Sequence, residues 1–126
     1  MSLTPEDLLK EARTFISEID SQEAYAITET DNPFIIDVRE PAERIEGFIP
    51  ASTNIPRGVL EFKITNHEEV NNKKRPILVY CETGMRGALA TYTLRKMGFS
   101  NARNLIGGFQ AWKQVGLSVD RDPDAW

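Results

Sequence analysis

Two short apolar runs, residues 34–38 and 76–80, are the clearest strand-like segments in the chain. Runs of this length that are rich in isoleucine and valine are typical of strands buried on both faces. The segment 102–105 is expected to form another short strand. Apolar residues at helical spacing fill the intervals between these segments. The pattern therefore predicts an α/β fold, in which a parallel sheet is covered by helices on both faces.

The first helix is expected ahead of the strands, at residues 5–18, where apolar side chains recur at helical spacing. Thr4 can cap this helix, and Pro5 suits its first position. Further helices are expected at 21–29, 59–64, 86–97 and 109–115. The segment 49–56 contains two prolines and is expected to be extended, with at most a brief strand.

The composition narrows the class of protein. A chain of 126 residues suffices for one domain with its own apolar core. The net charge is −4, and the basic run Lys73-Lys74-Arg75 is short, so we expect no nucleic-acid partner. The sequence offers neither a stretch long enough to span a membrane nor an apolar signal segment. A cytoplasmic location without a membrane partner is therefore expected.

Cys81 is the only cysteine, and it directly follows the apolar run 76–80. A single cysteine cannot form an internal disulfide or a metal-binding CxxC pair, and it suits a reducing compartment. The sequence shows no cluster of metal-ligating residues, so we expect neither a metal nor an organic cofactor. Because ligands of parallel sheets gather beyond the carboxyl ends of the strands, Cys81 stands where a functional group is expected.

The loop 81–86 joins the end of this strand to the start of a helix. Such a loop can turn its backbone N–H groups inward and form a concave anion site, to which the helix start adds its positive end. Gly84 allows the backbone angles that a tight loop needs. Arg86 places a cation at a helix start, where it is otherwise unfavourable, which suggests that it faces an anion. These features favour the thiolate of Cys81, the nucleophilic form of cysteine.

The plain alternative is that a single cysteine at a strand end is a small buried apolar residue. Arg86 taken alone is equally well explained as a solvated residue of the first helical turn. The combination of Cys81, Gly84 and Arg86 between a strand and a helix favours a reactive site over this alternative.

Four segments resemble, in order, the motifs of the rhodanese-like family. They are 37–41 (DVREP) with Glu43, 47–56 (GFIPASTNIP), 78–81 (LVYC) with Gly84 and Arg86, and 107–112 (GGFQAW). The resemblance extends from Ile19 to Val119. It leaves residues 1–18 as an additional helical extension and 120–126 as an acidic tail.

This resemblance implies a sheet of five parallel strands and a sulfurtransferase that carries sulfur as a persulfide on Cys81. The sulfur passes from a donor such as thiosulfate to cyanide, a small thiol or a protein acceptor. The residues expected to bind the substrate are Glu82, Thr83, Gly84, Met85, Arg86 and Gly87. Asp37, Arg39 and Glu43 are expected to support the loop, with Arg39 and Glu43 forming a structural ion pair.

Loop length separates the implied activity from its nearest alternative. Four residues lie between Cys81 and Arg86, which resembles the loop of the sulfur-transferring members of this fold. The loop of the phosphatases and arsenate reductases of the same fold is one residue longer. A second alternative is a non-enzymatic persulfide relay or redox-sensing module that docks on another protein. Phe48, Ala51-Ser52 and Gly87 depart from the common family pattern, and these departures concern substrate preference rather than the nucleophile.

Overall fold

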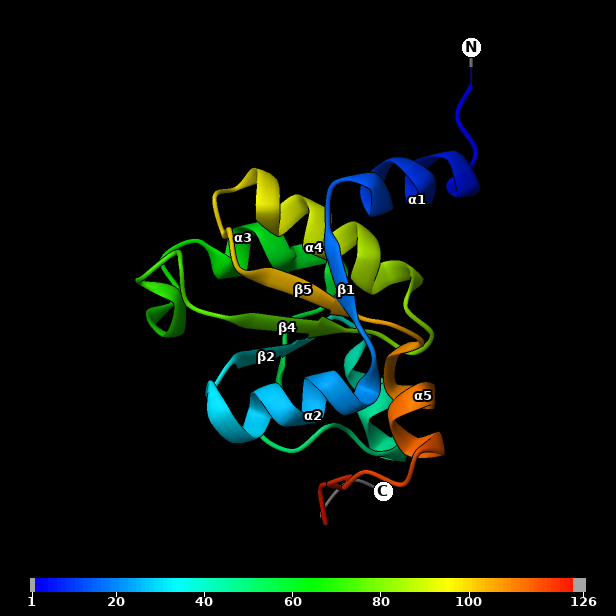
Figure 1. The fold of residues 1–126 in the computed structure, drawn as a ribbon, viewed down its shortest axis with the longest axis vertical. Helices are drawn as coiled ribbons and strands as arrows, with labels where there is room; N and C mark the ends of the chain where they lie inside the picture. The colour runs from blue at the N-terminus through cyan, green and yellow to red at the C-terminus, as the bar shows by residue number, and fades with distance from the viewer. Residues whose placement is uncertain (1, 124–126) are drawn as a thin grey trace.

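The computed structural model describes residues 2–123 and shows a parallel sheet between two helical layers (Figure 1). The strand order is β1-β5-β4-β2-β3, and all pairs are parallel. The strands are β1 (Ser17–Ile19), β2 (Phe34–Asp37), β3 (Thr53–Asn54), β4 (Ile77–Tyr80) and β5 (Ala102–Leu105). The α-helices are α1 (Pro5–Thr14), α2 (Ser21–Thr30), α3 (Leu60–Ile64), α4 (Met85–Lys96) and α5 (Gly108–Gln114). Short 3₁₀ turns cover Pro41–Glu46, Arg57–Val59 and Glu68–Val70.

The predicted α/β sheet with helices on both faces is confirmed. One apolar core lies between the sheet and helices α3 and α4, with Leu60, Ile64 and Leu94 among its members. A second core lies on the other face, where α2 and α5 contribute Ala24, Phe109 and Trp112. Every residue of β2 and β4 is buried, as expected for central strands covered on both sides.

The register of the central strands brings their carboxyl ends level with one another. Asp37, the last residue of β2, pairs with Tyr80, the last residue of β4. Cys81 therefore begins its loop beside the segment that follows Asp37, and the two chain segments meet at one edge of the sheet. This is the place where open parallel sheets bind their ligands.

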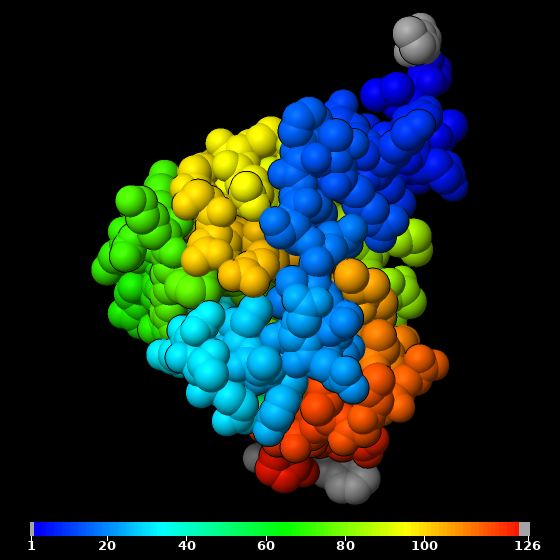
Figure 2. Space-filling view, viewed as in Figure 1, coloured from blue at the N-terminus to red at the C-terminus, as the bar shows by residue number. Residues whose placement is uncertain are grey.

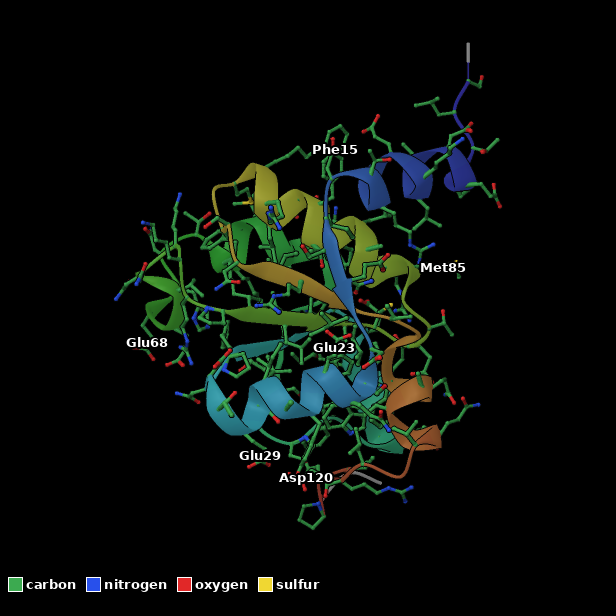
Figure 3. The ribbon with its side chains drawn as sticks, in the orientation of Figure 1. Phe15, Glu23, Glu29, Glu68, Met85 and Asp120 are labelled. Carbon is green, nitrogen blue, oxygen red and sulfur yellow. The ribbon has the colours of Figure 1, made fainter. Side chains whose placement is uncertain are left out.

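The first helix is shorter than the sequence predicted. Thr4 caps it as expected, accepting a hydrogen bond from the N–H of Asp7, but the helix ends at Thr14 rather than at residue 18. Phe15 closes the last turn and stacks on Tyr92 of α4, with ring centroids 5.7 Å apart (Figure 3). The chain then forms the edge strand β1, which pairs with β5. The helical spacing of apolar residues continues past Thr14, but backbone pairing with β5 overrides it.

The N-terminal segment extends beyond the rest of the molecule at the top of Figure 2, where it is blue. At the other end, Phe48 and Asp120 form an antiparallel bridge with hydrogen bonds of 2.9 Å in both directions. The last residues of the expected tail, 124–126, lie outside the described residues. Within residues 2–123, none of the helices has both the length and the apolar character needed to cross a bilayer.

Candidate active site

The thiol of Cys81 lies at the centre of a tight loop between β4 and α4. Its side chain is almost completely buried, and its Sγ accepts hydrogen bonds from two backbone N–H groups. Gly84 donates at 3.0 Å and Gly87 at 3.2 Å. Gly84 has a φ of 109°, a left-handed conformation that glycine adopts without strain. The loop thus converges on the sulfur, which is the arrangement that stabilises a small anion.

The start of α5 holds the backbone of this loop from the other side. Phe109 donates its N–H to the carbonyl of Cys81 at 2.8 Å, and Gln110 donates to the carbonyl of Glu82 at 3.1 Å. Gly108 lies so close to these carbonyls that a Cβ there would overlap them, and its φ is 60°. The glycine pair 107–108 was expected only as part of a family motif. The structure shows that it allows α5 to approach the Cys81 loop.

Asn104 is a part of the site that the sequence analysis missed. Its buried Nδ2 group donates to the carbonyl of Gly84 at 3.1 Å and to the carboxylate of Glu18 at 2.8 Å. Its Oδ1 atom has no hydrogen-bond partner among the described residues and lies against Gly87. A single asparagine in a short strand carries no sequence signal of this role; only its position on β5, next to β4, points to it.

Arg86 and Glu43 form a bidentate ion pair beside the Cys81 loop. The two terminal nitrogens of Arg86 donate to the two carboxylate oxygens of Glu43 at 2.7 and 2.9 Å. These hydrogen bonds are the main reason that the pKa of Glu43 falls to about 2, so the carboxylate stays ionised at any physiological pH. Glu43 also accepts the N–H of Glu40, which fixes its position in the turn.

The predicted ion pair between Arg39 and Glu43 is wrong. Arg39 is fully buried and binds the carboxylate of Asp37 through Nε and a terminal nitrogen at 2.9 to 3.2 Å. Its other terminal nitrogen donates to Glu82 at 3.0 Å, and it reaches Glu43 only at the backbone carbonyl. Burial disfavours the charge of Arg39, but its hydrogen bonds with Asp37 and Glu82 outweigh burial and raise its pKa. Arg39 therefore ties the segment after β2 to the Cys81 loop.

The tyrosine that precedes the nucleophile completes this buried polar network. The Tyr80 hydroxyl donates to Asp37 at 2.9 Å and accepts the N–H of Ile49 at 3.1 Å. Burial is the main cause that raises the pKa of Tyr80 to about 12, and the charge of Asp37 adds to it. Tyr80 is therefore protonated at neutral pH and links the end of β4 to the end of β2.

The structure brings most of the residues expected at the site together, but not all of them point at the sulfur. Gly84 and Gly87 donate to Cys81, while Arg86 reaches Glu43. The side chains of Thr83 and Met85 are exposed on the outside of the loop; Met85 is labelled in Figure 3. Their place in substrate binding stays a prediction.

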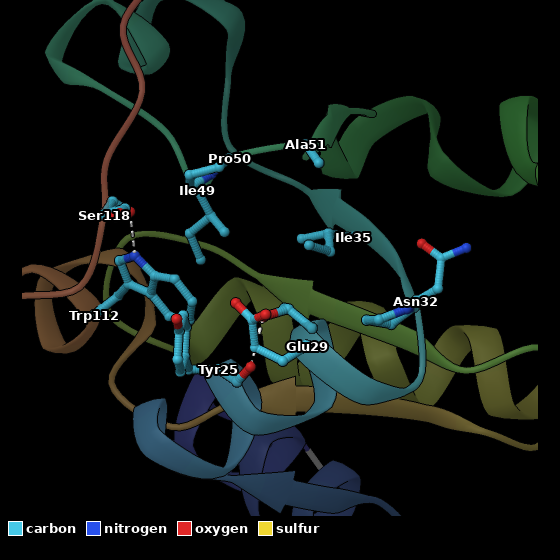
Figure 4. A pocket seen from close by; sticks show the side chains of 11 residues that line it. Tyr25, Glu29, Asn32, Ile35, Ile49, Pro50, Ala51, Trp112 and Ser118 are labelled. Atoms are coloured by element: carbon cyan, nitrogen blue, oxygen red, sulfur yellow. Dashed lines mark hydrogen bonds between the residues drawn. The ribbon is translucent and has the colours of Figure 1, made fainter.

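Of two hollows on the surface of the molecule, one borders the Cys81 loop. This one, of about 340 Å³, is lined by Glu43, Glu46, Glu82, Gln110 and Lys113. Glu82 belongs to the Cys81 loop and Glu43 pairs with Arg86, and we call this hollow the mouth of the site. The other, of about 320 Å³, is shown in Figure 4; Tyr25, Ile49 and Trp112 are among the residues that line it, and none of those residues belongs to the loop 81–87. Within residues 2–123, His, Cys, Asp and Glu side chains form no group of three that could hold a metal ion.

Several known proteins are similar to this chain in sequence or in structure. The chain is 30% identical over 105 residues to a sulfurtransferase of Allochromatium vinosum, covering 82% of this chain and 94% of the relative. It is 29% identical over 96 residues to the thiosulfate sulfurtransferase GlpE of Coxiella burnetii, covering 76% and 86%. A solved structure from Rhodopseudomonas palustris, of unknown function and described as a possible tyrosine phosphatase, superposes with a TM-score of 0.87 at 29% identity, covering 95% and 96%. The rhodanese-like domain model matches residues 20–115, and the chain therefore belongs to the rhodanese-like domain family.

Proposed function

We propose that this protein is a sulfurtransferase that carries sulfane sulfur as a persulfide on Cys81. The observation that carries the proposal is the pair of N–H groups, from Gly84 and Gly87, that converge on a buried sulfur at 3.0 and 3.2 Å. Donors fixed in this way stabilise negative charge without having to reorganise during the reaction. Burial protects the sulfur from side reactions in water.

Sulfur transfer takes two steps, the loading of Cys81 and the transfer to an acceptor. The Cys81 thiolate attacks the outer sulfur of thiosulfate, the sulfur–sulfur bond of the donor breaks, and sulfite leaves with the bonding electron pair. Cys81 then carries a persulfide. A nucleophile such as cyanide or a thiolate attacks the outer sulfur of the persulfide, which releases thiocyanate or a new persulfide and restores the Cys81 thiolate.

The relatives support the donor class. The name of the C. burnetii relative includes thiosulfate, and the A. vinosum relative is called a sulfurtransferase. Thiosulfate as donor and cyanide, a thiol or a protein as acceptor are accordingly part of the proposal. A cytoplasmic location completes it, because a reducing compartment keeps a single reactive thiol available.

A phosphatase is the second candidate, because the R. palustris structure is described as a possible tyrosine phosphatase. Loop length argues against it. Only four residues separate Cys81 from Arg86. The N–H groups of Gly84, within this span, and of Gly87, just after Arg86, already lie within hydrogen-bonding distance of one sulfur atom. A tetrahedral phosphate needs a wider ring of donors.

A paired activity assay tests the proposal. Thiocyanate formation from thiosulfate and cyanide is measured for the parent protein and for Cys81→Ser, and the hydrolysis of an aryl phosphate is measured on the same samples. We expect sulfur transfer by the parent alone and no phosphate hydrolysis by either protein. Phosphate hydrolysis that depends on Cys81, without thiocyanate formation, would establish the phosphatase instead.

A further inference from the structure

Both arginines near the nucleophile already have carboxylate partners. The terminal nitrogens of Arg86 bind both oxygens of Glu43. Those of Arg39 bind Asp37, Glu82 and two backbone carbonyls. Glu43 thus occupies the two terminal nitrogens of Arg86, whereas the Nε–H of Arg86 has no partner among the described residues. An incoming anion therefore meets an arginine whose charge is already compensated by a carboxylate.

The mouth of the site adds further negative charge. The hollow next to the loop is lined by the carboxylates of Glu43, Glu46 and Glu82, against the single ammonium group of Lys113. Glu43 and Glu82 are paired with Arg86 and Arg39, which do not line the hollow, so the groups that face it are mainly carboxylates. Glu43 and Arg86 are both partly exposed, with 31% and 41% of their side chains accessible, so the pair is in reach of a substrate. Because the carboxylate of Glu43 compensates the charge of Arg86, the pair has no net positive charge with which to attract an anion.

We propose that Glu43 determines the charge preference of this site. By occupying Arg86 it disfavours anionic sulfur donors such as thiosulfate, and it favours a thiol or persulfide that has an ammonium or guanidinium group beside its sulfur. This inference rests on the proposed sulfur transfer through Cys81. It places the sulfur of the partner at the loop and its positive charge among Glu43, Glu46 and Glu82.

Sulfur transfer between Cys81 and such a partner needs no further reagent. The Cys81 thiolate attacks the outer sulfur of a persulfide RS–SH, the sulfur–sulfur bond of RS–SH breaks, and RS⁻ leaves with the electron pair. In the reverse direction, a cationic thiolate takes the outer sulfur from the Cys81 persulfide. Both directions place the cationic group of R over the acidic mouth.

The test compares three acceptors that differ in charge: cysteamine, 2-mercaptoethanol and 3-mercaptopropionate. Cys81 is first loaded with sulfur, and the rate of sulfur transfer to each thiol is followed by the mass of the protein. The three thiols differ in intrinsic reactivity, so the informative quantity is the ratio of the cysteamine rate to the 3-mercaptopropionate rate in the parent and in each variant.

Glu43→Gln is the central variant, because glutamine can still accept the N–H of Glu40. Coulomb's law in water gives about a twofold effect for one unit charge at about 8 Å, in opposite directions for a cation and an anion. We expect the rate ratio to fall about fivefold in Glu43→Gln. The kcat/KM for thiosulfate should rise about tenfold, since a carboxylate no longer compensates the charge of Arg86.

Two further variants separate charge from structure. Glu46→Gln removes a carboxylate that has no ion pair or side-chain hydrogen bond with any described residue, and it should shift the rate ratio in the same direction by a smaller factor. Glu68→Gln makes the same change of net charge in the 3₁₀ turn Glu68–Val70, at the opposite side of the molecule from Met85 (Figure 3). It should leave the ratio unchanged.

Two peptides distinguish a small-molecule partner from a protein partner. Each contains one cysteine, flanked by lysines in one peptide and by glutamates in the other. Faster transfer to the lysine peptide than to cysteamine indicates a protein partner with a basic surface, and the reverse order indicates a small cationic thiol. Equal transfer to the lysine and glutamate peptides would contradict the inference.

The failure of this inference can be told apart from the failure of the proposed function. If Cys81 is loaded with sulfur but the rate ratio is the same in the parent, Glu43→Gln and Glu46→Gln, charge preference is refuted and sulfur transfer stands. If none of the donors loads Cys81, whatever its charge, the proposed function itself is refuted.

Discussion

Replacing Gly87 by alanine should damage the site through Asn104. Gly87 lies in the first turn of α4, and a Cβ at this position would overlap Oδ1 of Asn104. Asn104 is fully buried and is held by two hydrogen bonds, to Gly84 and to Glu18. To accommodate the methyl group, the side chain of Asn104 must move and weaken its hydrogen bond to the Gly84 carbonyl.

The expected cost follows from these contacts. Forcing a methyl group into a packed site costs about 1–3 kcal/mol, and each weakened hydrogen bond costs about 1 kcal/mol. Alanine regains about 1 kcal/mol over glycine inside a helix. The free energy of unfolding of Gly87→Ala should therefore fall by about 2 kcal/mol. Sulfur transfer should fall about ten- to a hundredfold, because the N–H donors of Gly84 and residue 87 are displaced from the sulfur.

A double-mutant cycle with Asn104→Ala tests this reasoning by urea unfolding. Asn104→Ala alone should cost about 2 kcal/mol, because it leaves the Gly84 carbonyl without its partner. In the double variant the added methyl group has space and only the gain in helix propensity remains, so the total cost should be about 1 kcal/mol, below that of Asn104→Ala alone. Gly58→Ala is the control, since a Cβ there meets nothing within 4 Å. Additive costs of Gly87→Ala and Asn104→Ala would refute the proposed clash.

Three further predictions concern the charge and the length of the loop. Arg86→Ala should lower kcat/KM for thiosulfate about tenfold in steady-state assays, because Glu43 is left unpaired at the mouth; unchanged kinetics would exclude Arg86 from the mechanism. Inserting a glycine between Gly84 and Met85 should lower sulfur transfer about a hundredfold, since the N–H groups no longer converge on one sulfur, and full activity would contradict the role of these N–H groups. The depressed pKa of Glu43, about 2 against 4.5, means that its ion pair stabilises the fold above pH 4.5 and that this stabilisation is lost as the pH falls toward 2. The unfolding free energies of the parent and Glu43→Gln should thus differ by about 1 kcal/mol at pH 7 and converge in acid; a difference that does not depend on pH would show that the ion pair is not its cause.

The central part of the fold could be predicted from the sequence because its signals are local. The apolar runs that form β2 and β4 are short and uninterrupted, and Cys81 follows one of them directly. The helix after the loop begins at Met85, one residue before the predicted start. In these segments the local pattern and the tertiary environment favour the same structure.

The errors occur where distant segments decide the outcome. Phe15 and Ile16 continue the helical spacing of α1, but the backbone of Ser17–Ile19 pairs with β5, which lies more than eighty residues further along the chain. The sequence analysis predicts an Arg39–Glu43 ion pair that supports the loop. In the structure Glu43 instead pairs with Arg86. The two residues are far apart in the sequence, and only the folded sheet brings them close.

The intact mass of the protein after treatment with excess thiosulfate decides whether Cys81 carries sulfur. We expect the parent to gain the mass of one sulfur atom and to lose it again when cyanide is added. Cys81→Ser should gain nothing under the same conditions. An added mass that persists in Cys81→Ser, or a parent protein that gains no mass with any sulfur donor, would contradict a persulfide on Cys81.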